Sequence, residues 1–164
     1  MSGSGRIVCD NPGVTIRDAG LADMPALRRV FRAASLSNTG DRAALLAHPE
    51  ALELADRAVR ESRTRVATED GEVVGFATLA GSDGDGGQLE LEDLFVAPDR
   101  MRQGIGRRLV GDAAAIARRR GARRIVVVAN PHARAFYEDV GFRADGETAT
   151  EFGPGLHMRL DLGT

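Results

Sequence analysis

The residues best suited to chemistry lie in a short glycine-containing turn, Arg102-Gln103-Gly104-Ile105-Gly106-Arg107. The turn follows an apolar stretch that predicts a strand, and it opens a segment with helical periodicity. Glycines let the backbone turn so that several N–H groups point at one place, beside the positive end of the helix dipole. The pattern predicts a phosphate or pyrophosphate cradle with arginines at its rim.

Charge is unevenly placed around this turn. Residues 82–99 contain six acids and no arginine, whereas residues 100–124 contain nine arginines and one acid, Asp112. All 22 basic residues of the chain are arginine, which stays charged and binds anions but does not act as a base. The triplet at 118–120 also fits a solvated helix end, where cations suit the helix dipole.

Several classes of site are excluded by residue type. Without lysine the chain has neither a Walker-type phosphate loop nor a pyridoxal Schiff base. A dinucleotide fingerprint would need a third glycine where Leu109 stands. The single cysteine, Cys9, and three histidines without ligand spacing predict no metal site.

The elements that position the turn follow from periodicity and from the turn residues. Strands are expected over Val14–Arg17, Thr64–Thr68, Val73–Leu79, Gln88–Val96, Arg124–Ala129, Phe142–Thr150 and His157–Leu162. Helices are expected over Asp23–Ala34, Asp41–Arg60 (broken at His48-Pro49), Gly104–Arg120 and Pro131–Val140. This order predicts a mixed α/β sheet.

Turns and caps add detail to this order. Asp70-Gly71 predicts a hairpin, and Asp23 is expected to cap the first helix. Residues 81–87 are expected to form a flexible loop, and the Gly-Pro-Gly stretch at 153–155 is expected to be a loop between the last two strands. In Gln88–Val96 the apolar alternation slips near Glu92-Asp93, which suggests a β-bulge.

Three stretches together resemble the Gcn5-related N-acetyltransferase (GNAT) superfamily, which transfers acetyl from acetyl-coenzyme A (acetyl-CoA) to an amine. They are Ile16-Arg17-Asp18-Ala19 with Asp23; Leu94-Phe95-Val96-Ala97-Pro98 with Gln103-Gly104-Ile105-Gly106-Arg107-Arg108-Leu109; and Asn130 and Ala133 with Phe136-Tyr137-Glu138 and Gly141-Phe142. Met101 departs from the family pattern, which has Gln or Arg there. Arg102 is expected to take the role of that side chain. The resemblance implies a mostly antiparallel central sheet of six to seven strands, flanked by helices and splayed at the fourth strand.

The resemblance also implies site residues. The amides from Gln103 to Arg107, with Arg102 at the rim, would hold the pyrophosphate. The strand Leu94-Phe95-Val96 would pair with the pantetheine arm through the backbone of Phe95 and Val96. Asn130 would contact the pantetheine, and Phe136 would pack along it.

The reaction needs an acid, an oxyanion partner and a base. The resemblance gives the acid role to Tyr137, the only tyrosine in the chain, which would protonate the departing thiolate. An amide of the splayed strand, that of Val96, would stabilise the oxyanion. Glu92 is the first candidate for the base that deprotonates the amine, acting directly or through water, and Glu90 is the second. A solvated acidic edge is an equally good interpretation of either carboxylate taken singly.

The predicted function is therefore an N-acetyltransferase with acetyl-CoA as cosubstrate and no metal, acting on a small-molecule or peptide amine. The alternative is a catalytically silent acyl-CoA sensor or partner-binding domain of the same fold. A nucleic-acid module is weakly supported, since aromatic residues are few and the net charge is −2. We expect a flexible tail over 1–13, one domain over 14–164, a cytoplasmic location, no membrane or nucleic-acid partner, and a possible homodimer.

Overall fold

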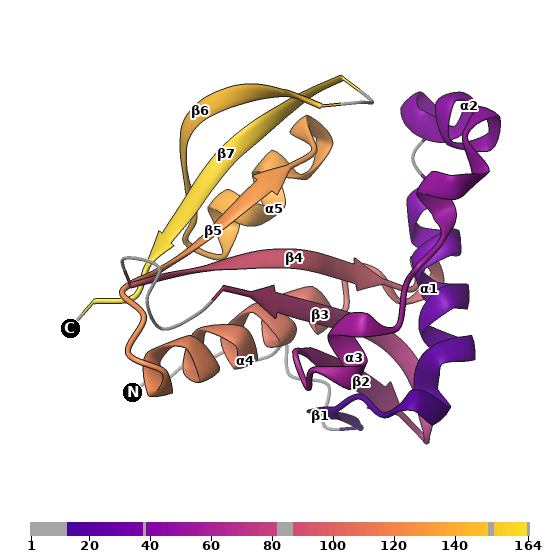
Figure 1. Cartoon of the computed structure of the whole chain (residues 1–164), viewed down its shortest axis with the longest axis horizontal. Coiled ribbons are helices and arrows are strands. Elements are labelled where there is room, and N and C mark those ends of the chain that lie inside the picture. The colour runs from indigo at the N-terminus through magenta and orange to yellow at the C-terminus, as the bar shows by residue number, and fades with distance from the viewer. Residues whose placement is uncertain (1–12, 38, 82–86, 151–152, 164) are drawn as a thin grey trace, which may run out of the picture. The chain divides into compact units, whose positions relative to one another are not determined.

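The computed structural model describes residues 13–37, 39–81, 87–150 and 153–163 (Figure 1). The strands form a seven-stranded sheet in the order β1-β2-β3-β4-β5-β7-β6, so the predicted mixed α/β class with a mostly antiparallel sheet is confirmed. The chain divides into two compact units, one containing Met1–Thr78 and Asp93–Leu109, the other containing Leu79–Glu92 and Val110–Thr164. Residues 1–12 of the tail expected over 1–13, and residues 82–86 of the loop expected over 81–87, lie outside the described residues.

The first unit contains three antiparallel strands, β1 (Val14–Asp18), β2 (Thr64–Glu69) and β3 (Glu72–Ala80), of which β3 ends in the second unit. Asp70 and Gly71 both have positive φ, 53° and 81°, which is the backbone of the predicted hairpin turn between β2 and β3. The register shifts between Ala67 and Thr68, so a bulge interrupts this hairpin.

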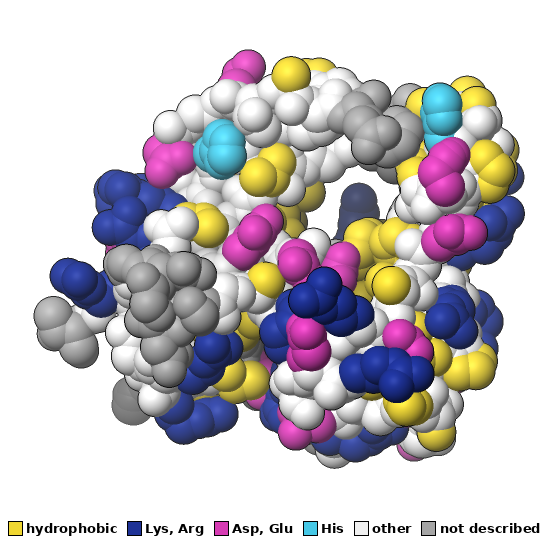
Figure 2. Space-filling model, viewed as in Figure 1, with side chains coloured by type: hydrophobic (Ala, Val, Ile, Leu, Met, Phe, Trp, Pro, Cys, Tyr) yellow, Lys and Arg dark blue, Asp and Glu magenta, His cyan; other side chains and the backbone are white. Residues whose placement is uncertain are grey.

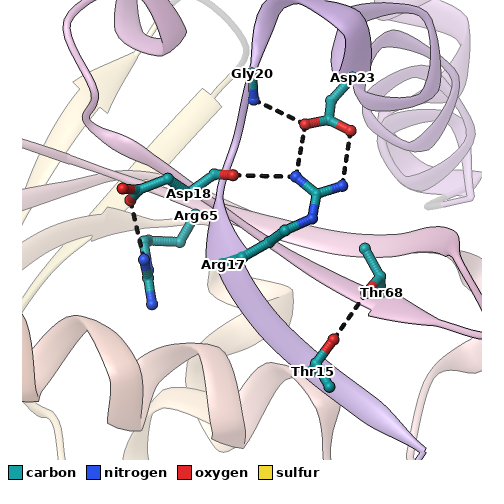
Figure 3. A network of polar contacts seen from close by, with 7 residues as sticks. All are labelled: Thr15, Arg17, Asp18, Gly20, Asp23, Arg65 and Thr68. Atoms are coloured by element: carbon teal, nitrogen blue, oxygen red, sulfur yellow. Dashed lines mark hydrogen bonds and ion pairs between the residues drawn. The ribbon is translucent and has the colours of Figure 1, made fainter.

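Helix α1 (Met24–Leu36) buries Met24, Leu27 and Val30 in the core of the first unit. Its start is organised differently from the prediction for Asp23, because that carboxylate makes no capping bond to α1. Asp23 instead accepts two hydrogen bonds from Arg17, of 2.9 and 3.0 Å, and one of 2.8 Å from the Gly20 amide (Figure 3). The Arg17 guanidinium lowers the pKa of Asp23, so the motif residues near 17–23 tie β1 to the start of α1.

The long helix expected over 41–60 is divided into three pieces. They are α2 (Thr39–Ala47), a 3₁₀ turn (Pro49–Leu52) and α3 (Arg57–Arg60). Pro49 occupies the first turn of the 3₁₀ segment, which explains the break at His48-Pro49.

The second unit contains β5 (Arg124–Ala129), β6 (Arg143–Thr150), β7 (Gly153–Asp161) and α5 (Arg134–Asp139). It also holds the first part of β4 (Gln88–Val96) and most of α4 (Ile105–Arg119). β4 runs parallel to β5, and their pairing extends only from Gln88 to Glu90, so the expected splay at the fourth strand is confirmed.

The burial of β4 changes part-way along the strand. Leu89 and Leu91 are buried and alternate with exposed Glu90 and Glu92, whereas residues 93–96 are all intermediate in exposure. The alternation therefore ends near the predicted slip at Glu92-Asp93. A bulge at that point stays a prediction.

The Gly-Pro-Gly loop prediction was wrong, because Gly153, Pro154 and Gly155 belong to β7. The pairing of β7 with β5 ends at Leu156, which lies opposite Ala129, and Pro154 pairs only with Ala149 of β6. A strand with one neighbour needs no N–H on its other side, so proline is tolerated there.

Candidate functional site

The backbone of the predicted cradle has the conformation of a turn that leads into a helix. Arg102 and Gly104 have positive φ, 65° and 83°, and α4 begins at Ile105. The amide of Arg108 donates to the Gly104 carbonyl at 3.0 Å, so the amides of residues 104–106 precede the first intrahelical bond. With exposed Arg102 at its rim, this turn suits a phosphate group.

Arg102 carries backbone strain that a glycine would avoid. We expect Arg102→Gly to raise the free energy of unfolding by about 1 kcal/mol relative to Arg102→Ala, because a non-glycine residue at positive φ is strained. Both variants should weaken coenzyme A binding by about fivefold, because an exposed ion pair contributes roughly 1 kcal/mol at most. Thermal unfolding and calorimetric titration measure the two effects. Equal free energies of unfolding for the two variants would contradict backbone strain at Arg102.

The loop before the cradle is held by an ion pair that sequence reasoning missed. The Arg100 guanidinium pairs with Glu69 at the end of β2 and lies 3.7 Å from the Glu72 carboxylate at the start of β3. The side chains of Arg100 and Glu69 are 29% and 16% exposed, so water screens this pair less than it screens a surface pair. The hairpin thereby anchors the segment that leads into the turn.

At the end of β4, the Phe95 side chain packs in the core, whereas the predicted contact with pantetheine needs only the strand backbone. The Phe95 ring packs against Phe31 and Phe76, with centroids 4.9 and 5.6 Å away. Leu94 and Val96 are partly buried on either side of it. The Phe95 side chain thus serves the core, and the backbone of this strand is what it can offer a ligand.

Gly75 of β3 is a second feature that sequence reasoning missed. A Cβ at this position would lie 2.9 Å from the Phe95 carbonyl oxygen, 3.2 Å from Leu109 Cδ1 and 3.3 Å from Ile105 Cγ2. Glycine here lets the Phe95 backbone and the first turn of α4 approach β3. The signal in the sequence is a lone glycine inside an apolar strand, which often marks a close backbone approach.

Tyr137 lies in the second unit, within an aromatic cluster. Its ring contacts Phe136 and Phe142 edge-on, both with centroids 5.2 Å away, and the residue is 7% exposed. Burial raises the pKa of the Tyr137 hydroxyl to about 12. The phenol therefore keeps its proton near neutral pH, which is the state that an acid needs.

The Tyr137 pKa can be read directly, because the chain has one tyrosine and no tryptophan. Phenolate absorbance near 295 nm should titrate at about pH 12 in the folded protein and near pH 10 in denaturant. The raised pKa stabilises the fold fully below about pH 10, and this contribution is lost as the pH rises to about 12. A folded-state midpoint near 10 would contradict the burial of the hydroxyl.

The other predicted site residues of the second unit differ in how far their side chains are exposed. Asn130 follows β5 and is exposed, and its side-chain oxygen accepts a 2.8 Å hydrogen bond from the His132 amide at the start of a 3₁₀ turn (Pro131–Ala133). Phe136 is partly buried. Glu90 and Glu92 are exposed on one face of β4. Residues 94–107 of the predicted site thus lie in the first unit, and Glu90, Glu92, Asn130, Phe136 and Tyr137 lie in the second.

The family model for the acetyltransferase (GNAT) family matches residues 29–142, well over half of the chain. The chain belongs to the GNAT family. Streptothricin acetyltransferase of Streptomyces lavendulae is 42% identical in an alignment of length 111 that covers 61% of this chain and 58% of that protein. The chain thus matches less than two thirds of this relative's length.

Solved structures share the GNAT fold. The PaiA N-acetyltransferase of Thermoplasma acidophilum, in complex with coenzyme A, has a TM-score of 0.72 at 18% identity, over 90% of this chain and 98% of that one. Nourseothricin acetyltransferase has a TM-score of 0.67 at 24% identity, over 92% and 99%. At these identities the likeness establishes the fold.

Three arginines after the turn donate hydrogen bonds to backbone carbonyls of the chain itself. Arg108 donates to the Val14 carbonyl at 2.5 Å, Arg118 to the Leu162 carbonyl at 3.3 Å, and Arg120 to the Gly81 carbonyl at 3.1 Å. These three therefore have structural partners. Within the described residues no group of three metal-ligating side chains gathers, and no helix is long and apolar enough to span a bilayer.

Proposed function

We propose that the chain is an N-acetyltransferase that moves the acetyl group of acetyl-CoA to a small-molecule primary amine by direct attack in a ternary complex. The observation that supports the catalytic part is the place of Tyr137, the only tyrosine of the chain, in the GNAT motif Phe136-Tyr137-Glu138, where its phenol is protonated near neutral pH. A domain that only binds acyl-CoA has no need of such an acid.

The first unit supports coenzyme A binding. The turn at 102–107 offers amides and the charge of Arg102 and Arg107 to the pyrophosphate, and the Phe95 and Val96 backbone offers strand-like pairing to the pantetheine. Asn130 and Phe136 complete the proposed contacts to the pantetheine arm. The coenzyme A in the PaiA structure is consistent with this assignment.

The chain's own groups would manage charge and protons during transfer. The Val96 amide stabilises the oxyanion that forms on the carbonyl oxygen. Tyr137 donates its proton to the departing sulfur. A primary amine is protonated at neutral pH, with a reference pKa between about 8 and 10.4, so a base must first remove one proton. We assign that step to Glu92, directly or through water, with Glu90 beside it on the same face.

Removing the carboxylate of Glu92 tests its role. Glu92→Gln should lower kcat/KM by about 10²-fold or more and change the pH–rate profile, because general base catalysis contributes about 10²–10⁴-fold. Glu147→Gln, which removes an exposed carboxylate from β6, is the matched control. An unmoved pH profile would transfer the role to Glu90 or to water alone.

A panel of primary amines with acetyl-CoA, followed by release of free thiol, tests the function itself. We expect thiol release that depends on the amine and yields the acetylated amine by mass spectrometry. Coenzyme A binding without release for any amine would favour the alternative, a catalytically silent acyl-CoA sensor. Because similar proteins are named streptothricin acetyltransferase and nourseothricin acetyltransferase, the panel includes streptothricin and nourseothricin.

A further inference from the structure

One face of the sheet in the second unit carries an ordered charge pattern. Over Leu89–Glu92 of β4, along β5 and over Leu156–Arg159 of β7, buried side chains alternate with more exposed ones, so each stretch has a core face and an outer face. Figure 2 shows acidic side chains over β4, a histidine over β7 and apolar side chains between them.

The strand register places this pattern in rows. Glu90 lies opposite Val126, and Val126 lies opposite Arg159. Two residues further along, Val128 lies opposite His157, and Glu92 follows Glu90 on the same face of β4. Carboxylates therefore line β4, aliphatic side chains line β5, and cationic or hydrogen-bonding side chains line β7.

Val128 and His157 show that the outer face is open. Val128 is 43% exposed, although its neighbours Val127 and Ala129 are 5% and 3% exposed. His157 is exposed between buried Leu156 and Met158. A partly apolar strip of this kind can carry the hydrocarbon part of a ligand.

The surroundings of the Arg159 guanidinium are a second observation that points to a ligand. Within the described part of the chain its Nε is buried and has no hydrogen-bond partner. The carboxylate of Asp161 lies 3.9 Å from this nitrogen, and the same carboxylate oxygen accepts a 3.1 Å hydrogen bond from Arg143. Because Asp161 is shared with Arg143 and the Arg159 side chain is 34% exposed, the guanidinium can still bind an anionic group of a ligand.

We propose that this face binds an acceptor that carries a carboxylate as well as its amine. The amine lies at Glu92 and Glu90, beside the opening where β4 leaves β5, the chain of carbon atoms crosses Val126 and Val128, and the carboxylate meets Arg159 with His157 as a second donor. Two strand spacings, roughly 10 Å between backbones, separate the charged rows. The proposal rests on the proposed acetyl transfer and names its substrate class, a small aminocarboxylate.

The proton and bond changes are those of acetyl transfer. The ammonium nitrogen loses two protons, the new C–N bond replaces the C–S bond, and the sulfur gains one proton through Tyr137. The second proton leaves through Glu92 to solvent. The carboxylate of the acceptor stays unchanged, so Arg159 and His157 determine specificity and do not take part in the chemical step.

The test compares acceptors that differ only in the carboxylate. With acetyl-CoA, 4-aminobutyrate and 6-aminohexanoate should have kcat/KM at least tenfold above those of propylamine and pentylamine, which keep the same amine and the same methylene chain. Arg159→Gln should remove this preference and leave the alkylamines unaffected, and Arg159→Lys should restore part of it. Arg134→Gln, which removes an exposed arginine of α5, should keep the preference.

A binding measurement separates this inference from the proposed function. The chain has three histidines, so the His157 imidazole signal can be assigned by its loss in His157→Asn. With coenzyme A present, 6-aminohexanoate should shift that signal and pentylamine should not. If the signal shifts but no amine is acetylated, the proposed acetyl transfer fails and only the aminocarboxylate-binding face stands. If the kcat/KM for alkylamines or diamines equals that for aminocarboxylates, the inference is overturned. It is also overturned if Arg159→Gln keeps the preference for aminocarboxylates.

Discussion

Tyr137→Phe should lower kcat by about 10²–10⁴-fold while the affinity for acetyl-CoA stays within about twofold of the original value. The phenol donates a proton to the departing thiolate, and acid catalysis of this kind contributes about 10²–10⁴-fold. Phenylalanine keeps the edge-on packing against Phe136 and Phe142, so the fold should not change. Steady-state kinetics and calorimetric titration of coenzyme A measure the two quantities.

Two further measurements make this result specific to the hydroxyl. Phe136→Leu, one position away, should weaken acetyl-CoA binding more than turnover, because we place this ring along the pantetheine. In Tyr137→Phe, the thiol-release rate should recover in part with an acyl donor whose thiolate is a better leaving group. Unchanged turnover in Tyr137→Phe would remove this residue from the mechanism.

Gly75→Ala should destabilise the first unit and weaken acetyl-CoA binding together. The added Cβ would meet the Phe95 carbonyl oxygen at 2.9 Å, and that atom belongs to backbone and cannot rotate away. Overpacking of a close contact costs about 1–3 kcal/mol. Displacement of the Phe95 backbone and of Ile105 moves both proposed parts of the coenzyme site, so we expect about a tenfold higher Kd.

Gly111→Ala in α4 is the matched control for Gly75→Ala. Among the described residues, nothing outside the neighbouring backbone of α4 lies within 4 Å of a Cβ at Gly111, and alanine favours a helix over glycine by about 1 kcal/mol. This variant should raise the melting temperature, whereas Gly75→Ala should lower it. Normal coenzyme A affinity in Gly75→Ala would show that the close approach serves packing alone.

Local chemistry made much of the fold predictable from sequence. Asp70-Gly71 needs positive φ at both positions, and few residues other than Asn, Asp and Gly accept that. The apolar face of α4 has helical spacing over four turns, so both of its ends were predicted to within one residue. Such signals depend on neighbours in the sequence and not on distant partners.

What escaped prediction depends on long-range pairing. In the sequence, Gly153, Pro154 and Gly155 look like a loop. They can be assigned to β7 only once Pro154 is known to pair with Ala149 of β6. Asp23 has the type and place of a cap, but the guanidinium of Arg17 competes for its carboxylate. The approach of Phe95 to Gly75 and the pair of Arg100 with Glu69 join residues that are distant in sequence. A lone glycine in an apolar strand marks a close approach without naming the partner, and no local pattern marks the ion pair.

The position of β7 between β5 and β6 has a consequence for the order of folding. During synthesis β6 emerges before β7, yet the sheet order places β7 beside both β5 and β6. Until residues 153–161 have been made, the edge of β5 stays open and β6 lacks its neighbour, and open strand edges favour aggregation. The closing strand is therefore the step at which a nascent chain gains protection from misassembly.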